Sequence, residues 1–275
     1  MAEPADDAAH TYIHGHRPSI LADHAGRSSA DSATFMTHLL ASGTVLLDVG
    51  CGPGTITCDL ADLVAPTQLI GIDSATDAIE HARGQAAERG VTNVRFEAGD
   101  VYNLRFDDAT FDVVYAHQVL QHLDRPVEAL IEMRRVSRPG GTVAVRDADY
   151  ATMVHAPHDD RMDRWLALYR EVAVRSGGQP DAGRYLSQWL DAAGFVDIVT
   201  TTSTWTYTDD ETRGRWRDLW VSRLLEARLG RLAEEHGLID RPGLEDLAHA
   251  WRRWADAPQA FFAFLHGEAI GTVPV

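Results

Sequence analysis

Cysteine is scarce in this sequence. Cys51 and Cys58 are the only two among 275 residues, which is too few for the disulfide framework of a small secreted protein. Long apolar runs are also missing. No stretch of about 18 apolar residues could cross a membrane, and the acidic first ten residues contain no apolar segment of the kind found in signal peptides. We therefore expect a cytoplasmic protein with no membrane partner.

Positive charge is the second shortage. Lysine and arginine total 25 against 41 aspartate and glutamate residues, which gives a formal net charge of −16. Such a chain repels polyanions unless its basic residues are grouped on one surface. The arginines at positions 213, 215 and 217 alternate with acids, which is typical of a solvated helix face. We therefore expect no nucleic-acid partner.

The first half of the chain alternates short β-branched runs with helical stretches. This alternation is typical of βαβ units in a parallel sheet with helices on both faces. Asp124 is the expected N-cap of the last of these helices, because it precedes Pro126 in the first turn. The expected strands cover residues 44–50, 68–74, 94–100, 111–117 and 141–147, and the expected helices cover about 55–65, 75–90 and 125–137.

The second half has a different pattern. Helices are expected over about 158–176, 184–193 and 209–257, and strands over 196–207 and 261–272. All seven tryptophans lie in this half. Two pairs, three and four residues apart, would each form a stripe on one face of a helix. The tryptophans either pack as a core or line an apolar pocket. We divide the chain into an N-terminal helical arm or lid (1–40), a ligand-binding core (41–150), cap helices with a return helix (151–194) and a last segment of strands with a helical insertion at 209–257 (195–275).

A glycine turn follows the first predicted strand. Gly50, Gly52 and Gly54 allow positive φ and leave no Cβ between the backbone and a ligand, and the turn opens a helix whose first N–H groups are unpaired. Its G-x-G-x-G spacing differs from the G-x-G-x-x-G of dinucleotide-binding turns. Ligands of open α/β sheets bind outside the carboxyl ends of the strands. The polar residues at those ends are Asp48, Asp73, Asp100, His117, Asp147 and Asp149.

The stretch LLDVGCGPGTITCDLA resembles the first motif of class I S-adenosylmethionine (SAM)-dependent methyltransferases. The resemblance continues in order through LIGIDSATDAIEHAR, VRFEAGDVYNL, FDVVYAHQVLQHL and EMRRVSRPGG, and covers at least residues 44–147. It is most similar to the ubiquinone/menaquinone-biosynthesis type (methyltransferase type 11-like), while YIHGHRPSILADHAGRSSADSA and AWRRWADAP resemble a small-molecule subgroup. The resemblance implies a Rossmann-like, mostly parallel sheet of about seven strands with an antiparallel last strand, an N-terminal helical arm and helical cap insertions.

The resemblance also implies a SAM site, with S-adenosylhomocysteine as the product. In such a site Gly50, Cys51 and Gly52 pass under the methionine portion, Asp73 accepts hydrogen bonds from the ribose, and Asp100 meets the adenine. Asp48 either approaches the ammonium group or pins the turn. The remaining implied cofactor residues are Tyr12, His16, Arg27, Ser74, Gly99, Val101, His117, Gln118 and His122. The spacing of Gln118 and His122 predicts that they share one helical face.

Methyl transfer from a sulfonium is an in-line displacement, so the protein mainly aligns the acceptor and excludes water. A general base is required only for acceptors that lose a proton. The candidate catalytic residues are His117, His122, Tyr150 and His155. We expect no metal, because His14, His16 and His24 alone are a weak ligand set in a chain with 13 histidines.

The aromatic second half favours a small apolar or aromatic acceptor and a role in biosynthesis. Two alternatives remain open at this point. One is a nicotinamide-dependent oxidoreductase on a similar sheet, and the other is a non-catalytic SAM-binding protein. The sequence leaves open whether O, N or C is methylated, and an N-terminal arm could exchange between subunits of a homo-oligomer.

Overall fold

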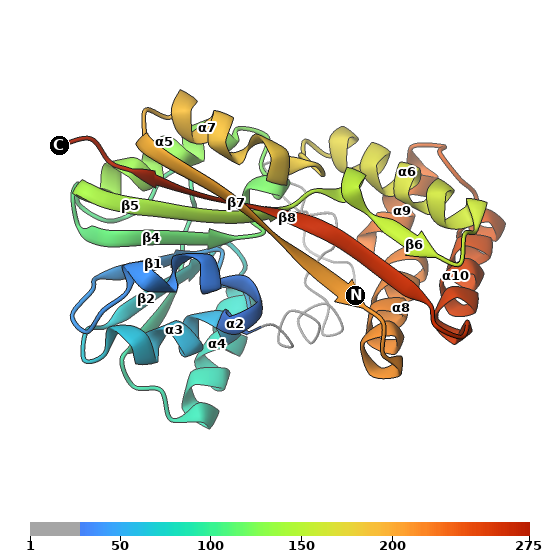
Figure 1. Ribbon diagram of the computed structural model, residues 1–275, viewed down its shortest axis with the longest axis horizontal. Coiled ribbons are helices and arrows are strands. Elements are labelled where there is room, and N and C mark those ends of the chain that lie inside the picture. The colour runs from blue at the N-terminus through green and yellow to red at the C-terminus, as the bar shows by residue number, and fades with distance from the viewer. Residues whose placement is uncertain (1–27) are drawn as a thin grey trace, which may run out of the picture.

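The computed structural model describes residues 28–275, and one mixed sheet organises them (Figure 1). The order is β3-β2-β1-β4-β5-β8-β6, with β7 pairing with β8. The first five strands are parallel to one another, and β8 is antiparallel to β5, β6 and β7. The strands are β1 (Leu46–Val49), β2 (Leu69–Asp73), β3 (Val94–Ala98), β4 (Phe111–His117), β5 (Ser137–Ala148), β6 (Val154–Ala156), β7 (Val196–Tyr207) and β8 (Phe261–Thr272). The predicted sheet with an antiparallel last strand is confirmed, although the short β6 was not predicted.

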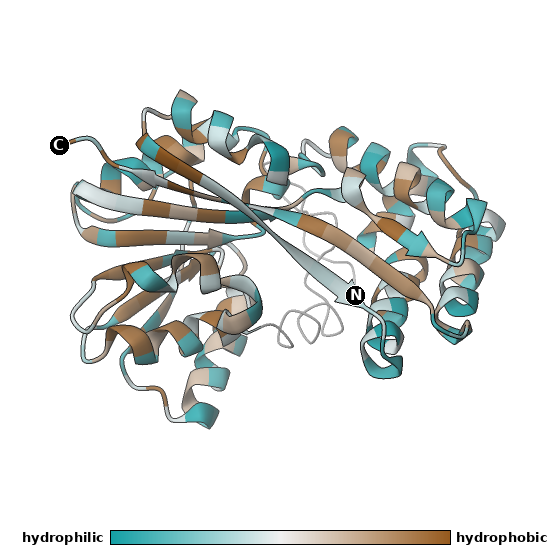
Figure 2. Ribbon diagram, in the orientation of Figure 1, coloured by the Kyte–Doolittle hydropathy of each residue, from teal (hydrophilic) through white to brown (hydrophobic). Residues whose placement is uncertain are grey.

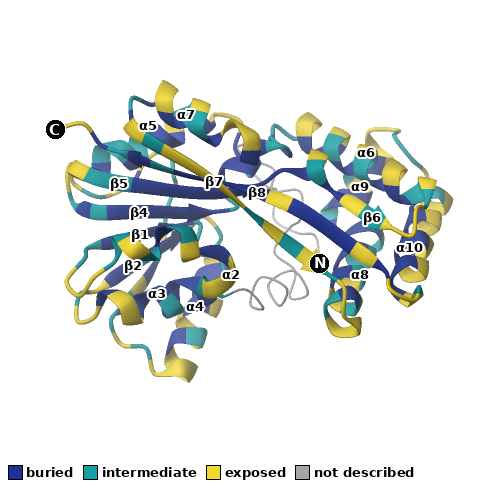
Figure 3. Ribbon diagram, in the orientation of Figure 1, coloured by how far each residue is buried: buried dark blue, intermediate teal, exposed yellow. Residues whose placement is uncertain are grey.

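Helices cover both faces of the parallel part. On one face, α5 (Pro126–Val136) and α7 (Leu186–Ala192) pack leucines and methionine against β1, β4 and β5. On the other, α3 (Thr55–Val64) and the short η1 (Thr34–Leu39) pack against the opposite side chains of the same strands. The remaining elements on this side are α2 (Ser29–Ser32) and α4 (Thr76–Arg89). Figures 2 and 3 show the result, with apolar, buried strands between helices whose outer faces are polar.

The predicted N-cap of α5 is wrong. The helix begins at Pro126 with Arg125 as its N-cap residue, and no side chain caps it. Asp124 is instead a hydrogen-bond acceptor for the hydroxyl group of Tyr102, at 2.8 Å. Asp124 lies just before the helix, as predicted, but its carboxylate is hydrogen-bonded to Tyr102 from the loop after β3 and not to the first N–H groups of the helix.

A helical cap extends from the other end of the sheet. It contains α6 (Asp160–Arg175), α8 (Asp210–Leu225), α9 (Arg228–Glu235) and α10 (Arg241–Asp256), the last three of which lie within the range predicted for the helical insertion. Trp165, Trp220 and Trp251 are fully buried, and the Trp165 ring meets the other two edge to face, with centroids 4.4 Å and 4.7 Å apart. These tryptophans therefore form the core of the cap.

Strand β8 joins the two parts. Its residues 266–272 pair with β5 in the core, whereas Phe261–Ala263 pair with β6 in the cap. Strand β7 pairs along nearly all of β8, and its outer edge is largely exposed (Figure 3). Within residues 28–275, no helix is both long and apolar enough to cross a membrane.

Candidate active site

The glycine turn lies between β1 and α3 and consists of strained backbone that only glycine adopts readily. Gly50, Gly52 and Gly54 have φ values of +72°, +52° and +79°. A Cβ at Gly50 would lie 2.3 Å from Cγ2 of Val119, and one at Gly54 would lie 2.7 Å from Cβ of Ala82. A Cβ at Gly52 would meet no atom of the described part of the chain within 4 Å. Gly50 and Gly54 therefore serve close packing, while Gly52 faces open space where a ligand can approach the backbone.

Asp73, at the end of β2, is fixed against this turn. Its Oδ2 accepts a hydrogen bond from the Gly52 N–H at 3.0 Å, and its Oδ1 accepts one from the Ala75 N–H at 2.9 Å. A carboxylate offers about four acceptor positions, so two backbone bonds leave capacity for two hydroxyl donors. The carboxylate is only partly buried. Asp73 is thus held in place by backbone and still able to accept from a ribose.

The end of β3 adds a second acid at the same edge. The Gly99 N–H donates to the Asp73 carbonyl oxygen at 3.0 Å, which ties the two strand ends together. Asp100 is exposed, and its Oδ1 accepts from the Tyr102 N–H at 2.9 Å. Val101 is partly buried and Ser74, after β2, is exposed. The strand ends of β2 and β3 thus bring the acids predicted for the ribose and the adenine to one rim.

Asp48 lies inside β1 and is buried. The Thr57 hydroxyl of α3 donates to its Oδ2 at 2.6 Å, which binds strand to helix directly beneath the turn. Burial raises the pKa of Asp48 to about 7, an effect that the Thr57 hydrogen bond only partly offsets. Burial also raises the pKa of the Cys51 thiol well above its usual value. Asp48 thus supports the turn from below, and a thiol so reluctant to ionise is a packing group.

The segment after β4 differs from the prediction. Gln118 has a φ of +54°, so it is not helical, and only Leu120–His122 form a short 3₁₀ turn, η2. Gln118 and His122 therefore do not share a helical face. The side-chain amide of Gln118 meets Nε2 of His266 at 2.8 Å, whereas His122 meets the side-chain amide of Gln121 at 3.1 Å. The left-handed residue turns the chain sharply where a regular helix start was expected.

An aromatic wall, formed by His117, Trp205, Phe264 and His266, lies beside this turn. His117 ends β4, and the other three come from β7 and β8. Ring centroids of Trp205 and His266 are 4.4 Å apart, those of Phe264 and His266 4.8 Å, and those of His117 and Trp205 6.0 Å. Sequence reasoning included only His117. Trp205 was considered only as one of seven tryptophans, and Phe264 and His266 were missed because these side chains meet only after β7 and β8 pair.

A fully buried arginine supports the aromatic wall. The Arg146 guanidinium donates to the Ser203 hydroxyl at 3.0 Å and to Oε1 of Glu268 at 3.3 Å, and lies over the Trp205 ring at 5.1 Å. Its Nη1 is 3.5 Å from Nδ1 of His117. A charged residue inside a strand that is otherwise apolar was the signal available in the sequence. Arg146 thus links the end of β4 to β7 and β8.

Two predicted catalytic residues lie in the cap. Tyr150 is buried, with its ring stacked on Tyr169 at 4.3 Å. His155 is in β6 opposite Phe262, four residues along β8 from His266, which corresponds to about 13 Å. The Tyr150 ring centroid lies 6.3 Å from that of Phe264 in the aromatic wall, so Tyr150 borders the wall from the cap side. Tyr12, His16 and Arg27 lie outside the described residues.

Comparison with known proteins agrees with this arrangement. Residues 40–194 match a family described as a methyltransferase domain, and the chain belongs to that family. An uncharacterized methyltransferase of Schizosaccharomyces pombe is 33% identical over 282 residues, covering 98% of each protein. An O-methyltransferase of Penicillium expansum is 36% identical over 162 residues, covering 58% of this chain and 55% of that protein. The fold is similar to a putative methyltransferase of Bacillus halodurans, with a TM-score of 0.60 at 19% identity, covering 90% of this chain and 100% of that one.

The protein is therefore a class I SAM-dependent methyltransferase, and SAM is its cofactor. This assignment replaces the nicotinamide-dependent alternative.

Proposed function

We propose that this methyltransferase transfers the methyl group of SAM to an oxygen atom of a small, largely apolar or aromatic metabolite in a biosynthetic reaction. The observation that carries this proposal is the aromatic wall, which begins at the end of β4 beside the glycine turn and continues onto β7 and β8. Trp205 is the partly exposed member of the wall, and its indole ring is suited to stacking with an aromatic acceptor, while the three buried rings support it from behind. The similarity to an O-methyltransferase over 58% of this chain supports oxygen as the acceptor atom.

In the proposed complex, the glycine turn and Asp73 hold SAM, while Asp100 and Val101 meet its adenine. The methyl group then faces the end of β4. The aromatic wall aligns the acceptor with the carbon–sulfur bond and keeps water away, which is the main requirement of an in-line displacement. An acceptor hydroxyl must lose its proton, and histidine is suited to take it near neutral pH. His117 and His122 are the proposed bases because they flank the turn after β4.

We further propose that the enzyme works in the cytoplasm. Cys51 and Cys58 are both buried free thiols, as is usual in a reducing compartment. A homo-oligomer stays a prediction.

Calorimetry with SAM tests the cofactor part of the proposal. Asp73→Ala and Asp100→Ala should each weaken SAM binding by about 1–3 kcal/mol, the range for a lost hydrogen bond to a charged group. Asp77→Ala is the matched control, because Asp77 is an exposed acid in the first turn of α4 and should leave the affinity unchanged. Wild-type affinity in both test variants would contradict the placement of SAM.

Release of S-adenosylhomocysteine with a panel of hydroxylated aromatics, aromatic amines and alkenes tests the acceptor part. We expect methylated oxygen as the product, and Trp205→Phe should raise the KM for the acceptor while SAM affinity stays normal. His117→Ala and His122→Ala should identify the base by lowering kcat with near-normal SAM binding in one of them. Transfer only to nitrogen or carbon would refute oxygen as the acceptor atom.

A further inference from the structure

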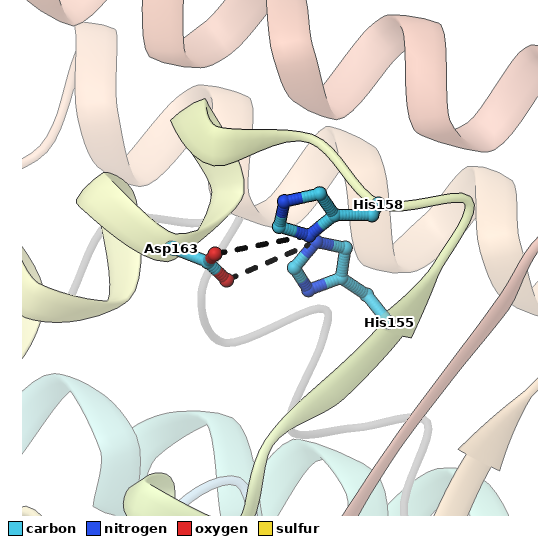
Figure 4. A group of neighbouring side chains, drawn as sticks. All are labelled: His155, His158 and Asp163. Carbon is cyan, nitrogen blue, oxygen red and sulfur yellow. Dashed lines mark ion pairs between the residues drawn. The ribbon is translucent and has the colours of Figure 1, made fainter.

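A second group of chemically capable side chains lies in the cap, away from the rim that binds SAM. His155 comes from β6, His158 from the loop that follows, and Asp163 from the first turn of α6. Figure 4 shows the three side chains pointing toward one another. Nε2 of His155 is 4.0 Å from Oδ1 of Asp163, and Nδ1 of His158 is 3.8 Å from Oδ2 of the same carboxylate. One ligand atom from each residue lies within 4.8 Å of the others.

The orientation of His158 is an independent observation. Its Nδ1 faces Asp163, while its Nε2 lies 2.8 Å from Oδ1 of Asp160. Histidines that bind a metal through one ring nitrogen usually donate the other N–H to a carboxylate or carbonyl group, which fixes the tautomer. Asp160 would supply that carboxylate. His158 is thus already arranged as a metal ligand with an outer carboxylate.

Asp159, the residue that follows His158, does not compete as a metal ligand, because its carboxylate is already paired. Both carboxylate oxygens of Asp159 accept hydrogen bonds from the guanidinium of Arg161, at 2.9 Å and 2.6 Å. The backbone N–H of Asp159 approaches Nε2 of His155 at 3.4 Å, a long contact. Within the described residues, Nε2 of His155 therefore has a weak hydrogen-bond partner that a metal ion could replace.

We propose that His155, His158 and Asp163 bind a divalent first-row transition-metal ion such as Zn²⁺, with Asp160 orienting His158. Imidazole nitrogens and a carboxylate oxygen are ligands that Zn²⁺ accepts at about 2.0–2.2 Å, so ligand atoms in a tetrahedral site are about 3.3 Å apart. The 3.8 Å and 4.0 Å separations, which run to different oxygens of Asp163, exceed this spacing by about 0.5 Å and 0.7 Å, so the side chains must move closer together around the ion. The His158 and Asp163 side chains are 68% and 60% exposed, so they can adjust and leave the remaining coordination to water.

Bound metal would connect β6 to the start of α6. These elements meet at the edge of the cap, where His155 pairs with Phe262 of β8. His155 is opposite Phe262, which lies two residues (about 7 Å) along β8 from Phe264 and four residues (about 13 Å) from His266, so we place the role of the metal in the cap. This spacing, His-x₂-His-x₄-Asp, was overlooked in the sequence because His155 was considered only as a base.

Titration of the metal-free, full-length protein with Zn²⁺ by calorimetry tests the proposal, and Co²⁺ as a substitute reports the ligand set through its visible absorption. We expect one ion per chain at this site and a higher Tm with the metal. His158→Ala and Asp163→Asn should abolish both the Co²⁺ spectrum of a nitrogen- and oxygen-bound ion and the rise in Tm. Asp160→Asn should weaken Zn²⁺ binding by about 10- to 100-fold, as expected for loss of an outer carboxylate.

Two controls separate this site from chance binding by other histidines. His236→Ala removes an exposed histidine at the end of α9 and should change nothing. The double variant His14→Ala/His16→Ala removes the H-x-H pair near the N-terminus and should retain Zn²⁺ binding. Loss of Zn²⁺ binding in that double variant with wild-type binding in His158→Ala would overturn the proposal, as would the absence of any binding to the wild-type protein.

Discussion

Replacement of Arg146 by methionine should destabilise the fold far more than loss of an ordinary ion pair. The Arg146 side chain is 0% exposed and that of Glu268 is 8% exposed, and their closest charged atoms are 3.3 Å apart. Glu268 also accepts a hydrogen bond from the Thr201 hydroxyl at 2.8 Å. Arg146→Met removes the guanidinium and leaves the buried Glu268 carboxylate with the neutral Thr201 hydroxyl as its partner among residues 28–275.

Breaking a buried ion pair from one side typically costs about 3–5 kcal/mol, because the remaining charge is uncompensated. That is a large share of a typical total stability of about 5–15 kcal/mol. The double variant Arg146→Met/Glu268→Gln removes both charges, and should be more stable than Arg146→Met alone by about 1 kcal/mol or more. Comparison of the single and double variants therefore distinguishes the destabilisation caused by the uncompensated Glu268 charge from that caused by lost packing around the aromatic wall.

Urea unfolding followed by far-UV circular dichroism measures each difference from the midpoint and slope of the transition. Arg175→Met is the matched control, because Arg175 and its partner Glu171 are 45% and 49% exposed on the surface of α6. Such an exposed pair contributes about 0–1 kcal/mol. If Arg146→Met were as mild as Arg175→Met, or if the double variant were no more stable than the single one, the reasoning about this buried charge would be refuted.

Two further predictions concern the turn and the buried acids. Gly50→Ala should destabilise the protein and abolish SAM binding, because its Cβ would lie 2.3 Å from Val119. Gly90→Ala is the control, since Gly90 has a similar positive φ but no described atom within 4 Å of the added Cβ; it should cost about 1 kcal/mol and leave SAM binding unchanged. Equal effects of the two variants in calorimetry and urea unfolding would contradict this prediction. Burial raises the pKa of Asp147 to about 7, so the folded state holds a proton that the unfolded state releases near pH 4, and stability should fall as pH rises from about 4 to about 7. Asp147→Asn should flatten that decline in urea midpoints measured across this range, and an unchanged slope would count against the burial argument.

Local patterns in the sequence were sufficient to predict the sheet and the placement of polar residues at the carboxyl ends of its strands. The strands of the parallel core were predicted within a few residues, because apolar runs and glycine turns are signals that neighbouring residues carry themselves. The positions of Asp73 and Asp100 were predictable for the same reason, since Asp73 is the last residue of β2 and Asp100 lies two residues after β3.

Features that depend on distant pairing were not predictable in this way. Trp205 and His266 become neighbours only through the register of β7 with β8. Gln118 has a left-handed backbone conformation, and its N–H donates a hydrogen bond to the Arg146 carbonyl oxygen of the neighbouring strand. His158 and Asp163 are close in sequence, but only the chain path from β6 into α6 turns them toward His155. In each case tertiary structure decides which side chains meet.

The continuous β7–β8 pair has a practical consequence for protein engineering. Because one uninterrupted strand belongs to both lobes, the cap is not a module that hangs from two flexible connectors. Grafting the cap of a relative onto this enzyme would require joins within paired strands, in matching register, since a shift of one residue would turn Phe262 and His266 to the opposite side of the sheet. Altering single side chains on these strands is consequently a sounder route to variants than exchanging whole lobes.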